Sequence, residues 1–299
     1  MFLPRRILEE KIRNMLAEDL GQGDVTTALI VPADGAAKAE VIAKDAGVIA
    51  GMEEAGILLE SLGLKAEILV PDGEKVKAKN ILIKISGNTR TILSAERTLL
   101  NIVSRMSGIA TTTRELIQKI RKAKLKTIVA CTRKVAPGLL YFDKKAVLIG
   151  GGDTHRLHLD DMILIKDNHI AVAGSIKKAI EKARKGVSFS KKIEIEVTRV
   201  KDVSAAARAR ADIIMLDNFS PEQIEKATKL LKKEHLFGKV LLEASGEITA
   251  ENILAYASKE IDIISLGEIT HGAKALDVSL EITKSNTAAT KRYAVKPLN

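Results

Sequence analysis

The second half of the chain alternates short apolar runs with segments of helical periodicity, and this constrains the fold more than any other feature. The last four strand–helix units recur at intervals of about 20 to 25 residues, and strands that alternate with helices are typical of a parallel sheet. Helices are predicted over 175–185, 200–208, 221–233 and 249–258. Seven runs are predicted as strands: 127–131, 146–149, 162–165, 193–197, 213–216, 240–242 and 263–266. Seven is one short of a complete eight-stranded barrel, so we expect an incomplete one.

The first part of the chain has a different order of predicted helices and strands. A helix over 7–20 precedes strands at 38–44, 67–70 and 81–85, with a second helix at 52–62. This mixture predicts antiparallel pairing. A long helical pattern then covers 89–124, with an expected break at Ser107-Gly108.

These two patterns of secondary structure predict two domains of an α/β protein. The first is an α+β sandwich domain over residues 1–108, and the second is an α/β barrel, the catalytic domain, over residues 109–275. Residues 278–282 alternate apolar and polar side chains, so they read as a strand. We expect segment 276–299 to return to the first domain.

Basic residues stand where predicted strands of the barrel end. Thr132-Arg133-Lys134 follows one run, His155-Arg156 follows a second, and Lys166 ends a third. The carboxyl ends of barrel strands meet at the edge where active sites lie. Converging cations repel one another unless an anion offsets their charge. The pattern therefore predicts a site for a small, multiply charged anion, although Arg133 and Lys134 would also suit a solvated loop.

Acids and glycines end the later strands. Glu194 and Glu196 share one face of their strand, and Asp217 and Glu243 end the next two. Neighbouring carboxylates suit Mg²⁺, although Glu196 and Asp217 would also suit inter-strand ion pairs. Glycine-containing turns before helices can present backbone N–H groups to a phosphate. Such turns occur at Ser245-Gly246 and at Gly267.

Composition narrows the classes of protein. The net charge of +10 is compatible with acidic substrates, an anionic membrane surface or nucleic acid, but aromatic residues make up only 3%. Binding of single-stranded nucleic acid usually relies on aromatic stacking, so this class is disfavoured. The single cysteine fits a reducing compartment, and no leader or membrane span is expected, which predicts a cytoplasmic location. Abundant Lys, Glu and Ile suggest a thermophilic source.

Several motifs taken together resemble one enzyme family. In order they are Glu96-Arg97-Thr98, Thr132-Arg133-Lys134 with Pro137-Gly138, Gly150-Gly151-Gly152 with His155-Arg156, Leu164-Ile165-Lys166-Asp167-Asn168-His169, Met215-Leu216-Asp217-Asn218-Phe219 and Glu243-Ala244-Ser245-Gly246. Their order and spacing resemble the quinolinate phosphoribosyltransferases over nearly the whole chain. Three positions depart from the family pattern, namely Leu140, Thr154 and His158.

The resemblance implies a reaction of quinolinate with phosphoribosyl pyrophosphate, in de novo NAD biosynthesis, that yields nicotinate mononucleotide, pyrophosphate and CO₂. It implies that Mg²⁺ is required, that Glu196 and Asp217 lie near ribose and metal, and that Lys134 contacts the phosphoribosyl donor. It further implies a homo-oligomer, dimer or hexamer, in which Arg97 enters the neighbouring subunit's site. Substrate contacts are implied for Arg97, Thr132, Arg133, His155, Arg156, Lys166, Ser245, Gly246 and Gly267.

Other readings remain at this point. A related phosphoribosyltransferase of the same fold would use another acceptor, and a family associated with molybdenum transport genes shares some of the motifs. A non-catalytic nucleic-acid-binding protein would place its basic residues in one exposed stripe. The positions of the cations at strand ends favour the enzyme.

Overall fold

The computed structural model describes residues 3–286. Its described residues up to Gly108 and from Lys274 onward form one compact unit, and residues 109–273 form the other. From the sequence we placed these divisions after residues 108 and 275. The predicted return segment 276–299 lies within the described residues only as far as residue 286.

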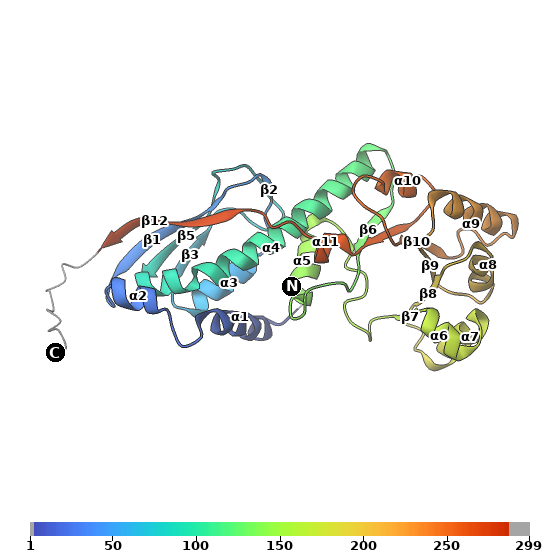
Figure 1. Cartoon of the computed structure of the whole chain (residues 1–299), viewed down its shortest axis with the longest axis horizontal. Helices are drawn as coiled ribbons and strands as arrows, with labels where there is room; N and C mark the ends of the chain where they lie inside the picture. Colours follow the sequence, from blue (N-terminus) through green and yellow to red (C-terminus); the bar gives the residue numbers. More distant parts are fainter. Residues whose placement is uncertain (1–2, 287–299) are drawn as a thin grey trace, which may run out of the picture. The chain divides into compact units, whose positions relative to one another are not determined.

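The first unit is an antiparallel sheet with helices. Its strand order is β12-β1-β5-β3, formed by Val278–Asn286, Ala36–Ala43, Ile81–Asn88 and Lys65–Ile68. Strand β12 pairs with β1, as Figure 1 shows for the red and blue arrows, so the C-terminal strand belongs to this sheet as expected. Helices α1 (Arg5–Leu20) and α3 (Met52–Ser61) occur where they were predicted.

Smaller elements of this unit were not predicted. The short helix α2 (Val25–Ile30) follows Asp24, whose carboxylate caps it by accepting a hydrogen bond from the Thr27 N–H at 2.9 Å. Strands β2 (Gly47–Val48) and β4 (Lys75–Val76) form a separate two-stranded ladder. Two-residue strands have no periodicity that a sequence can display.

The expected helix break at Ser107-Gly108 is wrong, because α4 runs without interruption from Thr89 to Lys122. A Cβ atom on Gly108 would lie 2.0 Å from the Lys274 carbonyl oxygen. Ser107 is fully buried, and its hydroxyl accepts a hydrogen bond from the Ala50 N–H at 3.0 Å. These small residues therefore serve close packing of the helix rather than its termination.

The second unit is built around a parallel sheet of six strands in a barrel-like arrangement. The order is β6-β11-β10-β9-β8-β7, so β7 to β11 lie side by side in sequence order, β11 pairs with β6, and β6 and β7 are the two edge strands. The strands are β6 (Ile128–Cys131), β7 (Ile163–Ile165), β8 (Ile193–Val197), β9 (Ile213–Asp217), β10 (Leu241–Ser245) and β11 (Ile263–Leu266). The incomplete barrel is confirmed, with one strand fewer than the seven expected.

The missing strand is the predicted run 146–149, which lies in helix α5 (Leu140–Gly150). A four-residue apolar run does not distinguish a strand from a buried helix turn. Residues 141–147 of this helix are all buried, and Leu148 is 50% exposed, so the burial of the segment does not alternate as it would in a half-buried strand. The sheet contact expected of that run is reduced to one parallel bridge between Ala130 and Asp153.

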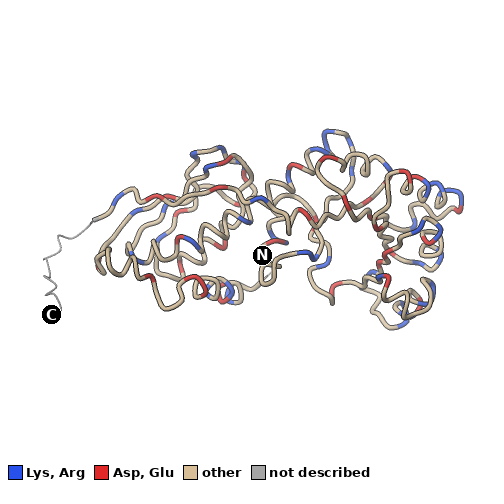
Figure 2. Tube along the Cα trace, viewed as in Figure 1, with Lys and Arg blue, Asp and Glu red and all other residues tan. Residues whose placement is uncertain are grey.

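Helices follow the strands of the second unit, as Figure 1 shows. Helices α8 (Val200–Arg208) and α9 (Pro221–Lys233) have the predicted bounds, α7 (Ile176–Gly186) nearly so, and α10 (Ile253–Ala257) is shorter than expected. Two short helices, α6 (Asp167–Ala173) and α11 (Glu268–His271), were not predicted. Figure 2 shows acidic residues interspersed among basic ones through both units. Among the described residues, no helix is long and apolar enough to span a membrane.

Candidate active site

A cavity of about 330 Å³ lies at the carboxyl ends of the barrel strands. Parallel strands bring these ends to one edge of a barrel, which is why residues distant in sequence meet there. Nine residues singled out from the sequence line the cavity: Thr132, Arg133, Lys134, His155, Arg156, Lys166, Glu196, Asp217 and Ser245. The predicted gathering of cations and acids at strand ends is therefore what the structure contains.

Three predicted residues do not line the cavity. Gly267 lies next to Lys134, which does line the cavity, since a Cβ atom on Gly267 would lie 3.0 Å from Cδ of Lys134. Gly246 has φ +130°, and a Cβ atom there would lie 2.4 Å from Oδ1 of Asn218, so only glycine fits this turn. Arg97 is an exposed residue of α4 in the first unit.

The two guanidinium groups of the cavity repel each other. Burial lowers the pKa of Arg156, and the charge of Arg133 lowers it further, with Glu194 opposing them. Repulsion of this kind is relieved when an anion binds between the cations. The arrangement is thus suited to a ligand with more than one negative charge, which Arg can bind through paired N–H groups.

Lys166 and Glu196 form an ion pair across neighbouring strands. The Nζ atom of Lys166 lies 2.6 Å from Oε2 of Glu196, and the exposed fractions of the two side chains are 47% and 13%. Burial raises the pKa of Asp217, and the negative charge of Glu196 adds to the shift. Two carboxylates that repel each other beside a cavity fit a hard divalent cation, whose preferred ligands are oxygens.

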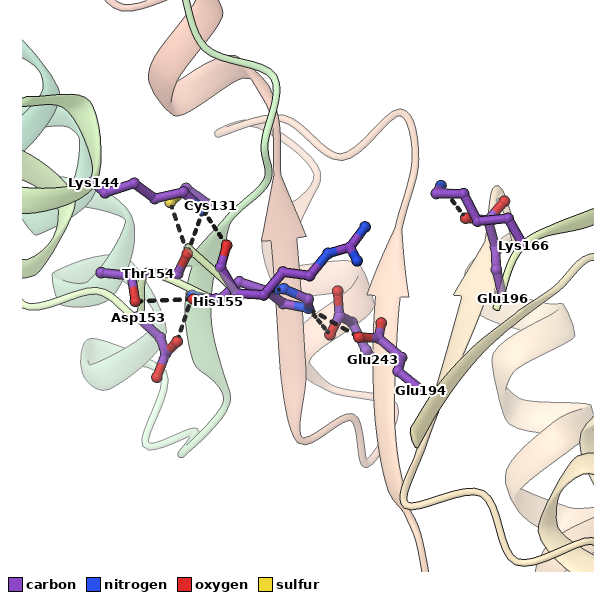
Figure 3. A network of polar contacts seen from close by, with 10 residues as sticks. Cys131, Lys144, Asp153, Thr154, His155, Lys166, Glu194, Glu196 and Glu243 are labelled. Atoms are coloured by element: carbon purple, nitrogen blue, oxygen red, sulfur yellow. Dashed lines mark hydrogen bonds and ion pairs between the residues drawn. The ribbon is translucent and has the colours of Figure 1, made fainter. Parts of the chain in front are cut away.

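His155 occupies a second, deeper cluster. Its Nε2 atom lies 3.2 Å from Oε2 of Glu194 and 3.2 Å from Oε2 of Glu243, both of which are fully buried (Figure 3). Its Nδ1 atom accepts a hydrogen bond from the backbone N–H of Arg156 at 2.8 Å. The ring therefore carries a proton on Nε2, directed at the two acids.

This cluster holds protons tightly. Burial disfavours the charged ring, but hydrogen bonds to Glu194 and Glu243 outweigh it and raise the pKa of His155 to about 10. Burial also raises the pKa of Glu194, with Glu243 adding to the shift. A second ring proton would have to sit on Nδ1, where Arg156 already donates. We therefore assign the additional proton of the cluster to Glu194.

Lys144 was not singled out from the sequence. It lies in α5, is fully buried, and donates hydrogen bonds to the backbone carbonyls of Thr154 and Arg156. The one available signal was Asp143-Lys144-Lys145, a charged triplet inside an otherwise apolar helix. Such a triplet resembles a solvated helix face, and only long-range contacts show that it is buried.

Comparisons with known proteins show which family the chain is similar to. The model of the quinolinate phosphoribosyl transferase C-terminal domain matches residues 109–281, and that of the N-terminal domain matches residues 24–107. The chain is 45% identical over 276 residues to a probable nicotinate-nucleotide pyrophosphorylase (carboxylating) of Methanocaldococcus jannaschii, covering 91% of this chain and 96% of that protein.

More distant relatives give the same result. The human nicotinate-nucleotide pyrophosphorylase (carboxylating) is 33% identical, with 96% of each chain covered. The solved structure of the nicotinate-nucleotide pyrophosphorylase from Francisella tularensis matches with a TM-score of 0.86 and 40% identity, covering 94% of this chain and 98% of that one. The similarity therefore extends over both units.

Proposed function

This chain belongs to the quinolinate phosphoribosyltransferase family, and on that premise we propose that it transfers the phosphoribosyl group of phosphoribosyl pyrophosphate to quinolinate. The carboxylate adjacent to the ring nitrogen leaves as CO₂, and the products are nicotinate mononucleotide, pyrophosphate and CO₂. The single observation that carries the proposal is the cavity in which Arg133, Arg156 and Lys166 meet.

Quinolinate is a small aromatic ring with two adjacent carboxylates. Arg133 and Arg156 repel each other in the free protein, and a dicarboxylate between them would offset both charges. Lys166 adds a point charge at the same cavity, and His155 and Thr132 supply polar contacts. These residues bind the acceptor and orient its ring nitrogen toward the sugar carbon.

The donor half of the site is assigned to the residues on the other strands. Lys134 contacts the donor's phosphates, Ser245 lines the same cavity, and the turns at Gly246 and Gly267 present backbone N–H groups to them. We propose that Glu196 and Asp217 hold Mg²⁺, because both offer oxygen ligands at the cavity and repel each other without a cation. When bound, Mg²⁺ would neutralise charge on the departing pyrophosphate.

The residues of the chain then act through position and charge. As pyrophosphate leaves, positive charge grows on the sugar, and the carboxylates of Glu196 and Asp217 are placed to stabilise it. Bond formation makes the ring nitrogen cationic, and this charge stabilises the electron pair that remains on the ring carbon when CO₂ departs. A proton from water then binds that electron pair and gives the C–H bond of the product. Fixed orientation of the two reactants supplies a further part of the rate acceleration.

We also propose a homo-oligomer, dimer or hexamer, in the cytoplasm, in which Arg97 completes the site of a neighbouring subunit. Within residues 3–286 Arg97 is exposed and forms no ion pair, which leaves its charge available.

Steady-state assays of the purified protein with Mg²⁺ and phosphoribosyl pyrophosphate test the proposal. Turnover of quinolinate is expected, and nicotinate, which lacks one carboxylate, should be a poor acceptor. Turnover of nicotinate with none of quinolinate would instead identify a phosphoribosyltransferase with another acceptor.

A further inference from the structure

Lys144 reaches the back of the cavity wall from inside helix α5. Its side chain is fully buried, and its Nζ atom donates to the Thr154 carbonyl and, at 3.2 Å, to the Arg156 carbonyl. The same Thr154 carbonyl accepts from Sγ of Cys131 at 3.5 Å. A buried lysine is costly unless its donors are used, and burial lowers the pKa of Lys144 accordingly.

The backbone that Lys144 holds has an unfavourable conformation. His155 lies between the two carbonyls and has φ +51°, in the left-handed region that residues other than glycine seldom adopt. Such a conformation costs on the order of 1 to 3 kcal/mol and persists only where surrounding contacts determine it. The N–H of His155 is also fixed, since it donates to Oδ1 of Asp153 at 2.6 Å.

The directions of the His155 and Arg156 side chains depend on this corner of the backbone, residues 154–156. In Figure 3 Lys144 and Cys131 lie on one side of Thr154, while the His155 ring extends away from them toward Glu243 and Glu194. His155 and Arg156 both line the cavity, whereas Lys144 does not. Rotation of the peptide planes around residue 155 would turn both side chains away from their present positions.

We propose that Lys144 is a positioning residue for the acceptor site, which fixes the carbonyls on either side of His155 and so directs His155 and Arg156 toward the anionic acceptor. The inference rests on the proposed function for the identity of that acceptor, the dicarboxylate. It predicts an effect on acceptor binding that is larger than the effect on donor binding, because the corner carries acceptor-binding residues and none of those assigned to the donor.

Lys144→Met tests the proposal, because methionine is similar in length but has no hydrogen-bond donor. We expect the quinolinate KM to rise by about tenfold or more, with kcat and the KM for phosphoribosyl pyrophosphate within about threefold of wild type. Lys144→Gln, which keeps a donor on a shorter side chain, should give an intermediate KM. A crystal structure of Lys144→Met should show His155 outside the left-handed region.

Thr228→Val is the matched control. Thr228 is buried in α9, outside the cavity lining, and its hydroxyl donates to the Glu225 carbonyl at 3.0 Å. Its loss should lower the melting temperature without changing the quinolinate KM. The proposal is overturned if folded Lys144→Met keeps the wild-type KM and the wild-type φ at His155, or if neither Lys144 variant folds, since the lysine would then serve the fold alone.

The outcomes for the reaction and for Lys144 are separable. If the wild-type protein does not use quinolinate, the proposed function fails, while the crystal structure of Lys144→Met still reports on the corner. If the wild type uses quinolinate and the variant does so with an unchanged KM, only the positioning role fails.

Discussion

The Nζ atom of Lys166 lies 2.6 Å from the Oε2 atom of Glu196, so a cation assigned to the acceptor neutralises an acid assigned to the metal. The pair links the two halves of the cavity in the free protein. A dicarboxylate that binds Lys166 and a Mg²⁺ ion that binds Glu196 would each have to break this ion pair. Acceptor binding by Lys166 and metal binding by Glu196 are therefore coupled.

A double-mutant cycle measures this coupling. Lys166→Met should lower the free energy of unfolding, because the Glu196 carboxylate loses its cation. Adding Glu196→Gln should remove that destabilisation. Because the lysine is 47% exposed, we expect a coupling free energy in urea unfolding of only about 0.5 to 1 kcal/mol. In kinetics Lys166→Met should mainly raise the quinolinate KM. Additive effects on stability would show that the two side chains do not interact in solution.

Arg133→Ala tests the guanidinium pair. Loss of a charged partner that the bound acceptor desolvates costs about 2 to 5 kcal/mol, so quinolinate kcat/KM should fall by about thirtyfold or more. Arg184→Ala is the matched control, because that arginine forms a surface ion pair with Asp212 at 2.8 Å, away from the cavity. Equal kinetics for the two variants would remove Arg133 from the acceptor site.

The site was largely predictable because the sheet is parallel. Each strand ends at the same edge, so the residues after β6 and β7 and those at the ends of β8 and β9 had to meet. Lys166 and Asp217 could be placed there without any knowledge of contacts. The ion pairs at that edge could not be predicted, because the spacing of Glu194 and Glu196 along one strand does not indicate which cation each carboxylate contacts.

The errors arose where local patterns are ambiguous. Run 146–149 is apolar whether it forms a strand or a helix turn, and nothing within its four residues distinguishes the two structures. Gly108 signals a helix break in isolation, but it is required by the Lys274 carbonyl that packs against it. Lys144 was missed because its burial depends on elements distant in sequence.

Glu194→Gln tests the assignment of a proton to the buried cluster. Glutamine resembles a protonated glutamate, and Oε1 of Glu194 lacks a hydrogen-bond partner among the described residues. Burial raises the pKa of Glu194 above the ordinary 4.5. The contribution of this carboxyl group to stability is therefore complete below pH 4.5 and is lost as the pH rises through its pKa in the folded protein.

We therefore expect the unfolding free energy of wild type to fall relative to that of Glu194→Gln as pH rises from about 5 to 9. Urea denaturation at several pH values measures the difference. A constant difference over this range, or a relative gain by wild type, would mean that Glu194 is ionised in the folded protein and balanced by the charged ring.

Arg97 is expected to act across a subunit interface. Arg97→Ala and Lys166→Ala should each be nearly inactive, because each removes a cation from the proposed site. Mixing the two after subunit exchange should restore activity, since one kind of hybrid site contains both cations. Exchange is checked by mass spectrometry with one partner isotope-labelled, and exchanged oligomers that remain inactive would argue against a shared site.

The most direct test of the central claim uses quinolinate labelled with ¹³C in the carboxylate adjacent to the ring nitrogen. With phosphoribosyl pyrophosphate and Mg²⁺, wild-type protein should release labelled CO₂ and form nicotinate mononucleotide in equal amounts, and Arg133→Ala should lower both together. Formation of a nucleotide that retains the label, or use of nicotinate in preference to quinolinate, would contradict the account.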